Sequence, residues 1–211
     1  MKPALLTQSR YAIALHTSSP DLGLAISNFT GDSRQQVWQL GRDLSTHLHQ
    51  HLSDFLAPQT WVDLAFVAVA TGPGGFTGTR IGVVTARTLA QQLQIPLFGV
   101  SSLAAIAYTH AETEGTIAVQ MPAQRGELYA AIYQTSSAGL TALVPDLVLT
   151  GSVWQQMLSA LSVPYQLIEA EADQGGRVTT VLKLAHQHWQ QGDRPNWSEV
   201  LPFYGQHPVQ H

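Results

Sequence analysis

The order of apolar and polar positions divides the first half of the chain into alternating strands and helices. Short apolar runs bounded by turn residues are typical of strands, and apolar residues repeating every three or four positions are typical of amphipathic helices. The pattern predicts strands at residues 11–15, 22–26, 37–40, 64–70 and 97–100, and helices at about 43–56, 79–93 and 103–110.

The second half repeats this order of three strands, a helix, a strand and a helix in a shorter form. Its strands are expected at residues 116–121, 127–134, 140–149 and 165–168, and its helices at 153–161 and 178–191. The repetition predicts an α/β protein with two related lobes, at residues 1–101 and 102–211. The second lobe is the smaller, and its C-terminal segment can pack back on the first.

Composition excludes several classes of protein. The 211 residues are 45% hydrophobic and 11% charged, and the chain contains no cysteine. A chain of this size should bury about 70% of the surface that it would expose when unfolded, so it can form a substantial core. The absence of cysteine excludes disulfide scaffolds, thiolate zinc sites and thiol nucleophiles.

Charge is distributed unevenly and argues against direct binding of nucleic acid. Residues 1–100 have six Lys/Arg and five Asp/Glu, a net of +1, whereas residues 101–211 have four and nine, a net of −5. Neither half has the basic cluster that would neutralise phosphates.

The sequence also predicts no membrane span and no signal peptide. No apolar run approaches the about 18 residues of a membrane span, and the N-terminus does not resemble a signal peptide. We expect a cytoplasmic protein.

A glycine-rich segment joins the strand at 64–70 to the helix that follows it. Free amides at a helix N-terminus favour anions, and glycines allow a ligand to approach the backbone. The segment nevertheless lacks the Lys of a Walker loop and a regular Gly-x-Gly-x-x-Gly spacing. It is therefore either a phosphate-binding loop or a tight turn that packs the helix against the sheet. The candidate ligand-binding residues are Gly72, Gly74, Gly75, Thr77 and Gly78.

Other combinations of polar residues have simpler explanations. His47 and His51 lie one helical turn apart, but no Glu is placed as in His-Glu-x-x-His, and no third ligand is near. A solvated or interface helix face explains them better, so no metal site is predicted. Ser101 and Ser102 lack the Gly-x-Ser-x-Gly context of a hydrolase nucleophile, and no catalytic residue is assigned.

Two predicted helices, at residues 45–56 and 79–93, mix core positions with positions that could contact another subunit. Apolar side chains on such helices stabilise an association by about 1.5–3 kcal/mol each when they are buried. The alternative is that both helices only cover the sheet of their own lobe, and the residue pattern leaves the two open. The candidate contact residues are Leu44, His47, Leu48, His51, Leu52, Phe55, Arg80, Val84 and Arg87.

Residues 72–82, with the sequence GPGGFTGTRIG, resemble the TsaB (YeaZ) family of bacterial tRNA-modification proteins. The family pattern has serine where this chain has Gly75. The resemblance is dense over residues 64–104 and thinner after Tyr133. It extends to residues 14–18, 125–129 and 202–204.

This resemblance implies a two-lobed fold like those of actin and Hsp70 (the ASKHA fold). Such proteins assist the synthesis of threonylcarbamoyladenosine in tRNA as non-catalytic partners of the catalytic subunit TsaD, and an ATPase, TsaE, joins the complex. Helices of the first lobe then pair with TsaD, or with a second copy of the chain in a homodimer. Contact with tRNA is expected only through the complex, and no membrane partner is expected.

The chain departs from the family at positions that bear on nucleotide binding. Relatives have Asp at the first strand and Asp-Ala-Arg before the second lobe's Gly-Glu. This chain has His16 at the first position and Pro122, Ala123 and Gln124 at the second. Because Mg²⁺ prefers oxygen ligands, we expect no ATP hydrolysis by the isolated chain and no resident cofactor.

The sequence is compatible with three functions. The favoured one is a scaffold that stabilises TsaD. An actin-like ATPase or small kinase that uses residues 72–78 is the alternative, and the missing acids argue against it. A metallopeptidase lacks its histidine motif, because the pair at positions 47 and 51 lies on the expected interface helix.

Overall fold

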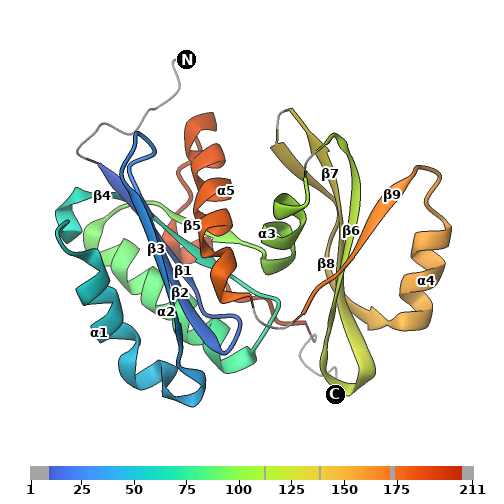
Figure 1. Cartoon of the computed structure of the whole chain (residues 1–211), viewed down its shortest axis with the longest axis horizontal. Helices are drawn as coiled ribbons and strands as arrows, with labels where there is room; N and C mark the ends of the chain where they lie inside the picture. The colour runs from blue at the N-terminus through green and yellow to red at the C-terminus, as the bar shows by residue number, and fades with distance from the viewer. Residues whose placement is uncertain (1–9, 112, 138, 172–173, 206–211) are drawn as a thin grey trace.

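The computed structural model describes residues 10–111, 113–137, 139–171 and 174–205. The chain forms two sheets with helices on both faces of the first sheet and of the second (Figure 1). The layers run from α1 and α2, through the first sheet, to α5 and α3 in the middle, and then through the second sheet to α4. This arrangement is the two-lobed α/β fold expected from the sequence.

The first sheet has five strands in the order β3-β2-β1-β4-β5. Strand β2 is antiparallel to both of its neighbours, β1 and β3, and β1, β4 and β5 run parallel. The central strand β4 is buried along its whole length, which explains its unbroken apolar sequence. The bounds are β1 Tyr11–His16, β2 Asp21–Ser27, β3 Ser33–Gln39, β4 Leu64–Ala70 and β5 Leu97–Val100.

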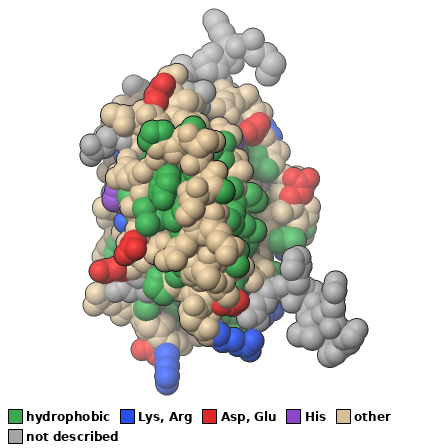
Figure 2. All heavy atoms as spheres, turned by 90° about the vertical axis from the view of Figure 1, so that its right-hand side faces the viewer, with side chains coloured by type: hydrophobic (Ala, Val, Ile, Leu, Met, Phe, Trp, Pro, Cys, Tyr) green, Lys and Arg blue, Asp and Glu red, His purple; other side chains and the backbone are tan. Residues whose placement is uncertain are grey.

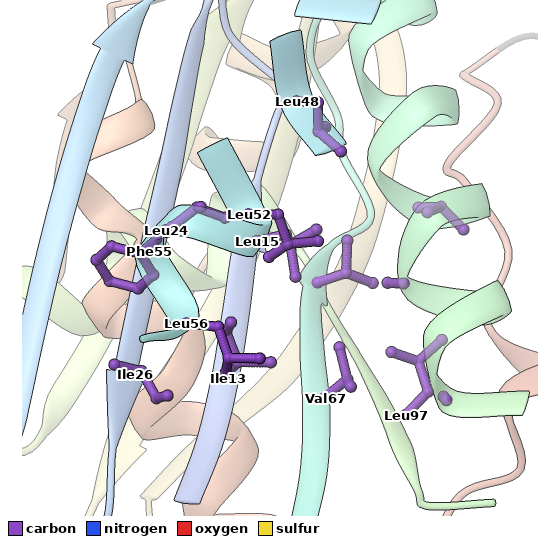
Figure 3. Close-up of a cluster of buried hydrophobic side chains, with 14 of the residues drawn as sticks. Ile13, Leu15, Leu24, Ile26, Leu48, Leu52, Phe55, Leu56, Val67 and Leu97 are labelled. Atoms are coloured by element: carbon purple, nitrogen blue, oxygen red, sulfur yellow. The ribbon is translucent and has the colours of Figure 1, made fainter. Parts of the chain in front are cut away.

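The outer face of this sheet is covered by α1 (Leu44–Leu56) and α2 (Phe76–Leu93). The apolar positions of α1 point into a core that they share with β1, β2 and β4 (Figure 3). Their helical spacing places them on one side of the helix. The residues are Leu44, Leu48, Leu52, Phe55 and Leu56.

The second sheet has four strands in the order β8-β7-β6-β9. Its strand β6 is antiparallel to β7 and parallel to β9. Helix α3 packs on its inner face, and α4 contacts β7 and β8 on its outer face. The bounds are α3 Ser102–Thr109, β6 Gly115–Pro122, β7 Glu127–Ser136, β8 Gly139–Thr150, α4 Gly151–Ser159 and β9 Tyr165–Glu169.

The last helix, α5 (Val178–Gln191), returns to the first lobe. It contacts β1, β2 and β4 with a face that includes Val178, Val181 and Ala185, and it also touches α3. Residues after α5 continue along the first lobe, where the Leu97 amide donates to the Pro195 carbonyl. The division at residues 101 and 102 stays a prediction, and the structure adds this return of the chain. Short 3₁₀ turns complete the fold: η1 Gly41–Asp43, η2 Trp61–Asp63, η3 Gln124–Gly126, η4 Gly175–Arg177 and η5 Trp197–Glu199.

Two predicted boundaries were wrong. Helix α2 begins at Phe76 and not at residue 79, because the chain turns into the helix directly after Gly75. Thr77 and Gly78 therefore lie in the first turn of α2 and not in a loop. Strand β3 begins at Ser33, earlier than its apolar residues suggest, because it is an exposed edge strand whose partner among the described strands is β2.

Candidate functional site

The predicted contact residues of α1 divide into buried and exposed groups. Leu44, Leu48, Leu52 and Phe55 are at most 7% exposed and belong to the core of the first lobe. They fix α1 on the sheet and offer little surface to a partner. His47 is exposed, as are Arg80 and Val84 on α2, whereas His51 and Arg87 are partly buried.

Between α1 and α2 lies a groove of about 610 Å³, here called the α1/α2 groove. Its apolar lining comes from both helices and from Trp61 in η2, and Val84 at its edge is 60% exposed. Of the predicted contact residues, Leu52, Arg80 and Val84 line it. The groove is lined by Ser45, His49, Leu52, Trp61, Arg80, Ile81, Val84, Thr85, Thr88 and Leu89.

Most of this lining was not among the predicted contact residues, although its spacing on α2 could have indicated it. Ile81, Val84, Thr85, Thr88 and Leu89 follow the three- and four-residue spacing of one helix face. When one face of a helix already packs on a sheet, a second apolar stripe indicates that another part of the helix also packs against an apolar surface. The stripe was obscured because the residues of α2 that pack on the sheet follow the same spacing.

The histidines of α1 do not form a metal site. The His51 ring stacks on Trp38 of β3, with centroids 4.6 Å apart, and lies 6.2 Å from the His47 ring. Among the described residues, no group of three or more His, Cys, Asp or Glu side chains could hold a metal ion. His51 thus packs α1 against β3, and His49 is the histidine that reaches the α1/α2 groove.

The glycine-rich segment is packed tightly against the turn between β1 and β2. A β-carbon on Gly74 would overlap the Ser18 carbonyl oxygen, and one on Gly78 would overlap the Thr17 carbonyl oxygen. The amide of Gly75 donates to the Ser18 carbonyl oxygen over 2.7 Å. These close approaches account for glycine at positions 74 and 78 without a ligand. They support the second of the two interpretations, a tight turn that packs the helix against the sheet.

Gly72 differs, because its φ of +92° itself favours glycine. Its carbonyl oxygen accepts a 2.7 Å hydrogen bond from the Ser102 amide at the start of α3. Gly75 and Thr77 are exposed at the other end of the segment. The segment therefore links the first lobe to the helix that begins the second.

A small cleft of about 290 Å³ lies beside this segment, between the two lobes. The last described residues pass through it: the Phe203 amide donates a 2.7 Å hydrogen bond to the Thr71 carbonyl oxygen. The Phe203 ring meets Tyr129 of the second lobe edge-on, and the Tyr204 ring lies against Phe76 of the first. Residues 202–205 thus form a strap that contacts both lobes.

Two arginines of α2 lie against aromatic rings of this C-terminal segment or of α2 itself. The Arg80 guanidinium lies 5.0 Å from the centre of the Phe76 ring and 5.9 Å from that of Tyr204. Arg87 lies 5.7 Å from the centre of the Trp197 ring. Because Arg80 also lines the α1/α2 groove, it connects that groove with the cleft.

The two positions at which the family resemblance implies acids carry no carboxylate here. His16 is fully buried, its ring nitrogens have no hydrogen-bond partner within the described residues, and burial, helped by Arg177, lowers its pKa to about 4. Pro122 and Gln124 are exposed, and Gln124 lines the cleft. Glu127, which sequence analysis did not assign, does bring one carboxylate into the cleft.

A third surface is formed by α4 and β9 on the far side of the second lobe. Hydrophobic side chains gather on this side, and charged side chains lie mainly toward its margins (Figure 2). The exposed apolar residues there include Val153, Val163, Tyr165 and Leu167. A surface of this kind does not resemble a phosphate-binding face.

Comparison with known proteins identifies the family. A Bacillus subtilis protein named tRNA threonylcarbamoyladenosine biosynthesis protein TsaB is 35% identical over 157 residues, which cover 72% of this chain and 67% of that protein. This chain belongs to the TsaB family. An Escherichia coli TsaB protein is 38% identical over 80 residues, 37% of this chain and 35% of that protein.

A family model and a solved structure add two further similarities. The model described as TsaD, tRNA N6-adenosine threonylcarbamoyltransferase, matches residues 50–184. The structure of YeaZ from Pseudomonas aeruginosa superimposes with a TM-score of 0.73 at 23% identity, over 92% of this chain and 99% of that one. This likeness confirms the expected fold class. Within the described residues, no helix is long and apolar enough to cross a membrane.

Proposed function

We propose that this chain is the non-catalytic subunit of the complex that makes threonylcarbamoyladenosine in tRNA, where it binds and stabilises TsaD together with TsaE. The names of its relatives place them in this biosynthesis. The observation that carries the proposal is the α1/α2 groove, because it offers an apolar surface on two fixed helices. A partner that inserts apolar side chains would gain from their burial.

The chemistry of the groove fits a protein partner. Ile81, Val84 and Leu89 form one apolar stripe along α2, while His49 and Arg80 supply polar groups at its edges. An apolar centre with a polar rim is the usual organisation of a protein interface. In the absence of TsaD, a second copy of the chain would meet the same groove, which accounts for the expected homodimer.

We further propose that the chain is a degenerate relative of nucleotide-binding proteins and acts in the cytoplasm. The glycines at 74 and 78 serve packing, the cleft of about 290 Å³ is crossed by the strap, and His16 replaces an acid. This volume lies at the lower limit of the about 300–1,000 Å³ that small-molecule sites have, which argues against a nucleoside triphosphate as the ligand. Contact with tRNA is then made through the complex.

The alternative function is an actin-like ATPase or small kinase that uses residues 72–78. One observation favours it, namely that Glu127 and Arg80 both line the cleft. A carboxylate and a guanidinium could serve Mg²⁺ and phosphate respectively. Magnesium-dependent nucleotide binding by the isolated chain separates the two functions.

The decisive experiment is a reconstitution with TsaD and TsaE of the same organism, threonylcarbamoyl-adenylate and tRNA. Modified adenosine should form only when this chain is present. Substitution Val84→Glu places a charge in the α1/α2 groove and should abolish both TsaD binding and modification. The matched control is Val163→Glu, which changes an exposed valine on the second lobe.

Three results would contradict the proposal. Modification at an equal rate without the chain would remove the subunit role. Full activity and TsaD binding of Val84→Glu would show that the partner uses another face, and loss of binding with Val163→Glu alone would point to the α4 and β9 side.

A further inference from the structure

Three polar side chains form a hydrogen-bonded row beside α3, away from the α1/α2 groove. The Tyr133 hydroxyl donates to Oδ1 of Asp146 over 3.0 Å, and the hydroxyls of Ser101 and Tyr133 lie 3.3 Å apart. The Ser101 oxygen in turn accepts from the amides of Leu103 and Ala104 at the start of α3, over 3.0 and 3.2 Å.

When Asp146 is ionised, this arrangement sets the direction in which the hydrogen bonds of the row are donated. Because the Ser101 oxygen is occupied by two backbone donors, its own proton is free to go to Tyr133. The Tyr133 proton goes to Asp146, which can only accept when it is ionised. The row therefore delivers hydrogen bonds from a helix N-terminus to one carboxylate, and it stabilises the ionised form of that group.

The strand β8 brings Asp146 to this place through an irregularity. The pairing of β7 with β8 shifts between Ala130 and Ile132 and again between Ile132 and Tyr133. Such bulges bend a strand and redirect a side chain. Here Asp146 has no partner in the register of the strand pair, and its carboxyl group lies against Tyr133.

A cavity of about 720 Å³ opens beside this carboxyl group. Its walls are largely apolar and include Val100, Leu184 and Phe203, and its rim includes the exposed residues Ala142 and Pro145. Tyr133 is 4% exposed, whereas Asp146 is only partly buried. The carboxylate thus lies within an apolar cavity and remains within reach of a ligand.

Nothing in the described part of the chain supplies a positive charge to Asp146. Among the described residues no Lys or Arg forms an ion pair with it, and the one lining residue of the cavity that could carry a positive charge, His188 of α5, has its Nδ1 2.9 Å from Oδ2 of Asp193. Burial raises the pKa of Asp146, and the hydroxyls of Ser101 and Tyr133 act in the opposite direction. Burial likewise raises the pKa of Tyr133, so this group stays a donor.

We propose that this cavity binds a protonated primary amine on an apolar stem, with Asp146 as its counter-charge and Tyr133 and Ser101 as the groups that hold the carboxylate. The apolar walls take up the stem, and the carboxylate oxygen that is not bonded to Tyr133 meets the ammonium group. The ion pair forms at a partly buried site, where it is screened less than on the surface. This inference does not rest on the proposed function.

The test uses the full chain and n-butylammonium chloride as the probe, with amide NMR shifts followed at constant ionic strength. Saturable shifts are expected at Ser101, Leu103 and Ala142, and 1-butanol should bind at least about tenfold more weakly. Asp146→Asn should lower the affinity for butylammonium by about tenfold or more. The matched control is Asp54→Asn, which changes an exposed acid on α1 and should leave the affinity unchanged.

A second probe, Nα-acetyl-lysine methylamide, distinguishes two sources of the ammonium group, a lysine side chain of a partner protein and a free amine. Binding of both probes would assign the cavity to a lysine side chain of a partner, and binding of butylammonium alone would assign it to a free amine. Three outcomes would overturn the proposal: equal binding of 1-butanol, undiminished binding by Asp146→Asn, or shifts that do not saturate. The comparison of butylammonium with butanol needs no variant, so it decides even if Asp146→Asn fails to fold.

Discussion

The backbone amide of Gly75 donates a 2.7 Å hydrogen bond to the carbonyl oxygen of Ser18. The bond joins the turn between β1 and β2 to the start of α2, so an amide that could have met a phosphate is used within the chain. The neighbouring Gly74 has no room for a side chain at the same contact. The glycine motif thereby serves the close packing of the two segments.

Substitution Gly74→Ala should destabilise the chain, whereas Gly75→Ala should not. A β-carbon at position 74 would overlap the Ser18 carbonyl oxygen, but one at position 75 would lie 3.6 Å from it, an ordinary contact. Overpacking of this kind costs about 1–3 kcal/mol. Urea unfolding followed by circular dichroism measures both variants, and equal stabilities would show that the turn relaxes freely.

His16 should make the chain less stable in weak acid. Its pKa is about 4 in the folded state, below the ordinary value of about 6.5, so the unfolded state binds more protons between these values. Above pH 6.5 the His16 ring is neutral in both the folded and the unfolded state, so the free energy of unfolding has its full value there. It should fall by about 3 kcal/mol as the pH is lowered to 4.

The measurement is urea unfolding at pH 7, 6 and 5 for the wild type and for His16→Gln. The variant should lose most of the slope of stability against pH, since glutamine does not titrate. His49→Gln, which changes an exposed histidine on α1, should keep the wild-type slope. A slope that survives in His16→Gln would assign the pH dependence to other groups.

Much of the fold was predictable because each element has a strong local pattern. The helix at 178–191 was predicted with the bounds that α5 has, since its apolar face follows one regular period. Strand β4 was predicted because seven apolar residues stand together between turns. The start of α2 was not, because Gly75 at its N-cap has no side chain with which to mark the boundary.

The candidate sites were less predictable, because they depend on contacts between distant segments. Sequence spacing placed Leu44 and Leu48 on α1 but could not show that both side chains face the core. Nor could it show that His49 lines the α1/α2 groove. Glu127 belongs to the Gly-Glu pair of the resemblance, but that pair does not show that its carboxylate reaches the cleft, and Asp146 beside Tyr133 has no local motif. Their positions follow from sheet register and from a strand irregularity, which the sequence pattern does not specify.

The isolated chain should not bind Mg·ATP with micromolar affinity. The amide of Gly75 is bonded to Ser18, and the position of the first-strand acid is taken by buried His16. A hard cation therefore lacks that oxygen ligand. Titration calorimetry with ATP, with and without MgCl₂, should give no saturable heat, and a magnesium-dependent micromolar isotherm would favour the ATPase alternative.

The strap formed by residues 202–205 should contribute to stability by joining the lobes. Phe203 is partly buried between Thr71 of the first lobe and Tyr129 of the second, so Phe203→Ala removes contacts with both. The expected loss is about 1–3 kcal/mol, less than for a fully buried phenylalanine. Leu201→Ala is the matched control, because Leu201 is 59% exposed and its truncation should change the stability little.

Hydrogen exchange of the backbone amides distinguishes separation of the lobes from a local loss of packing. Faster exchange in Phe203→Ala at both Thr71 and Tyr129 would show that the lobes separate, whereas a change confined to the strap would show that they are held by α3 and α5 instead.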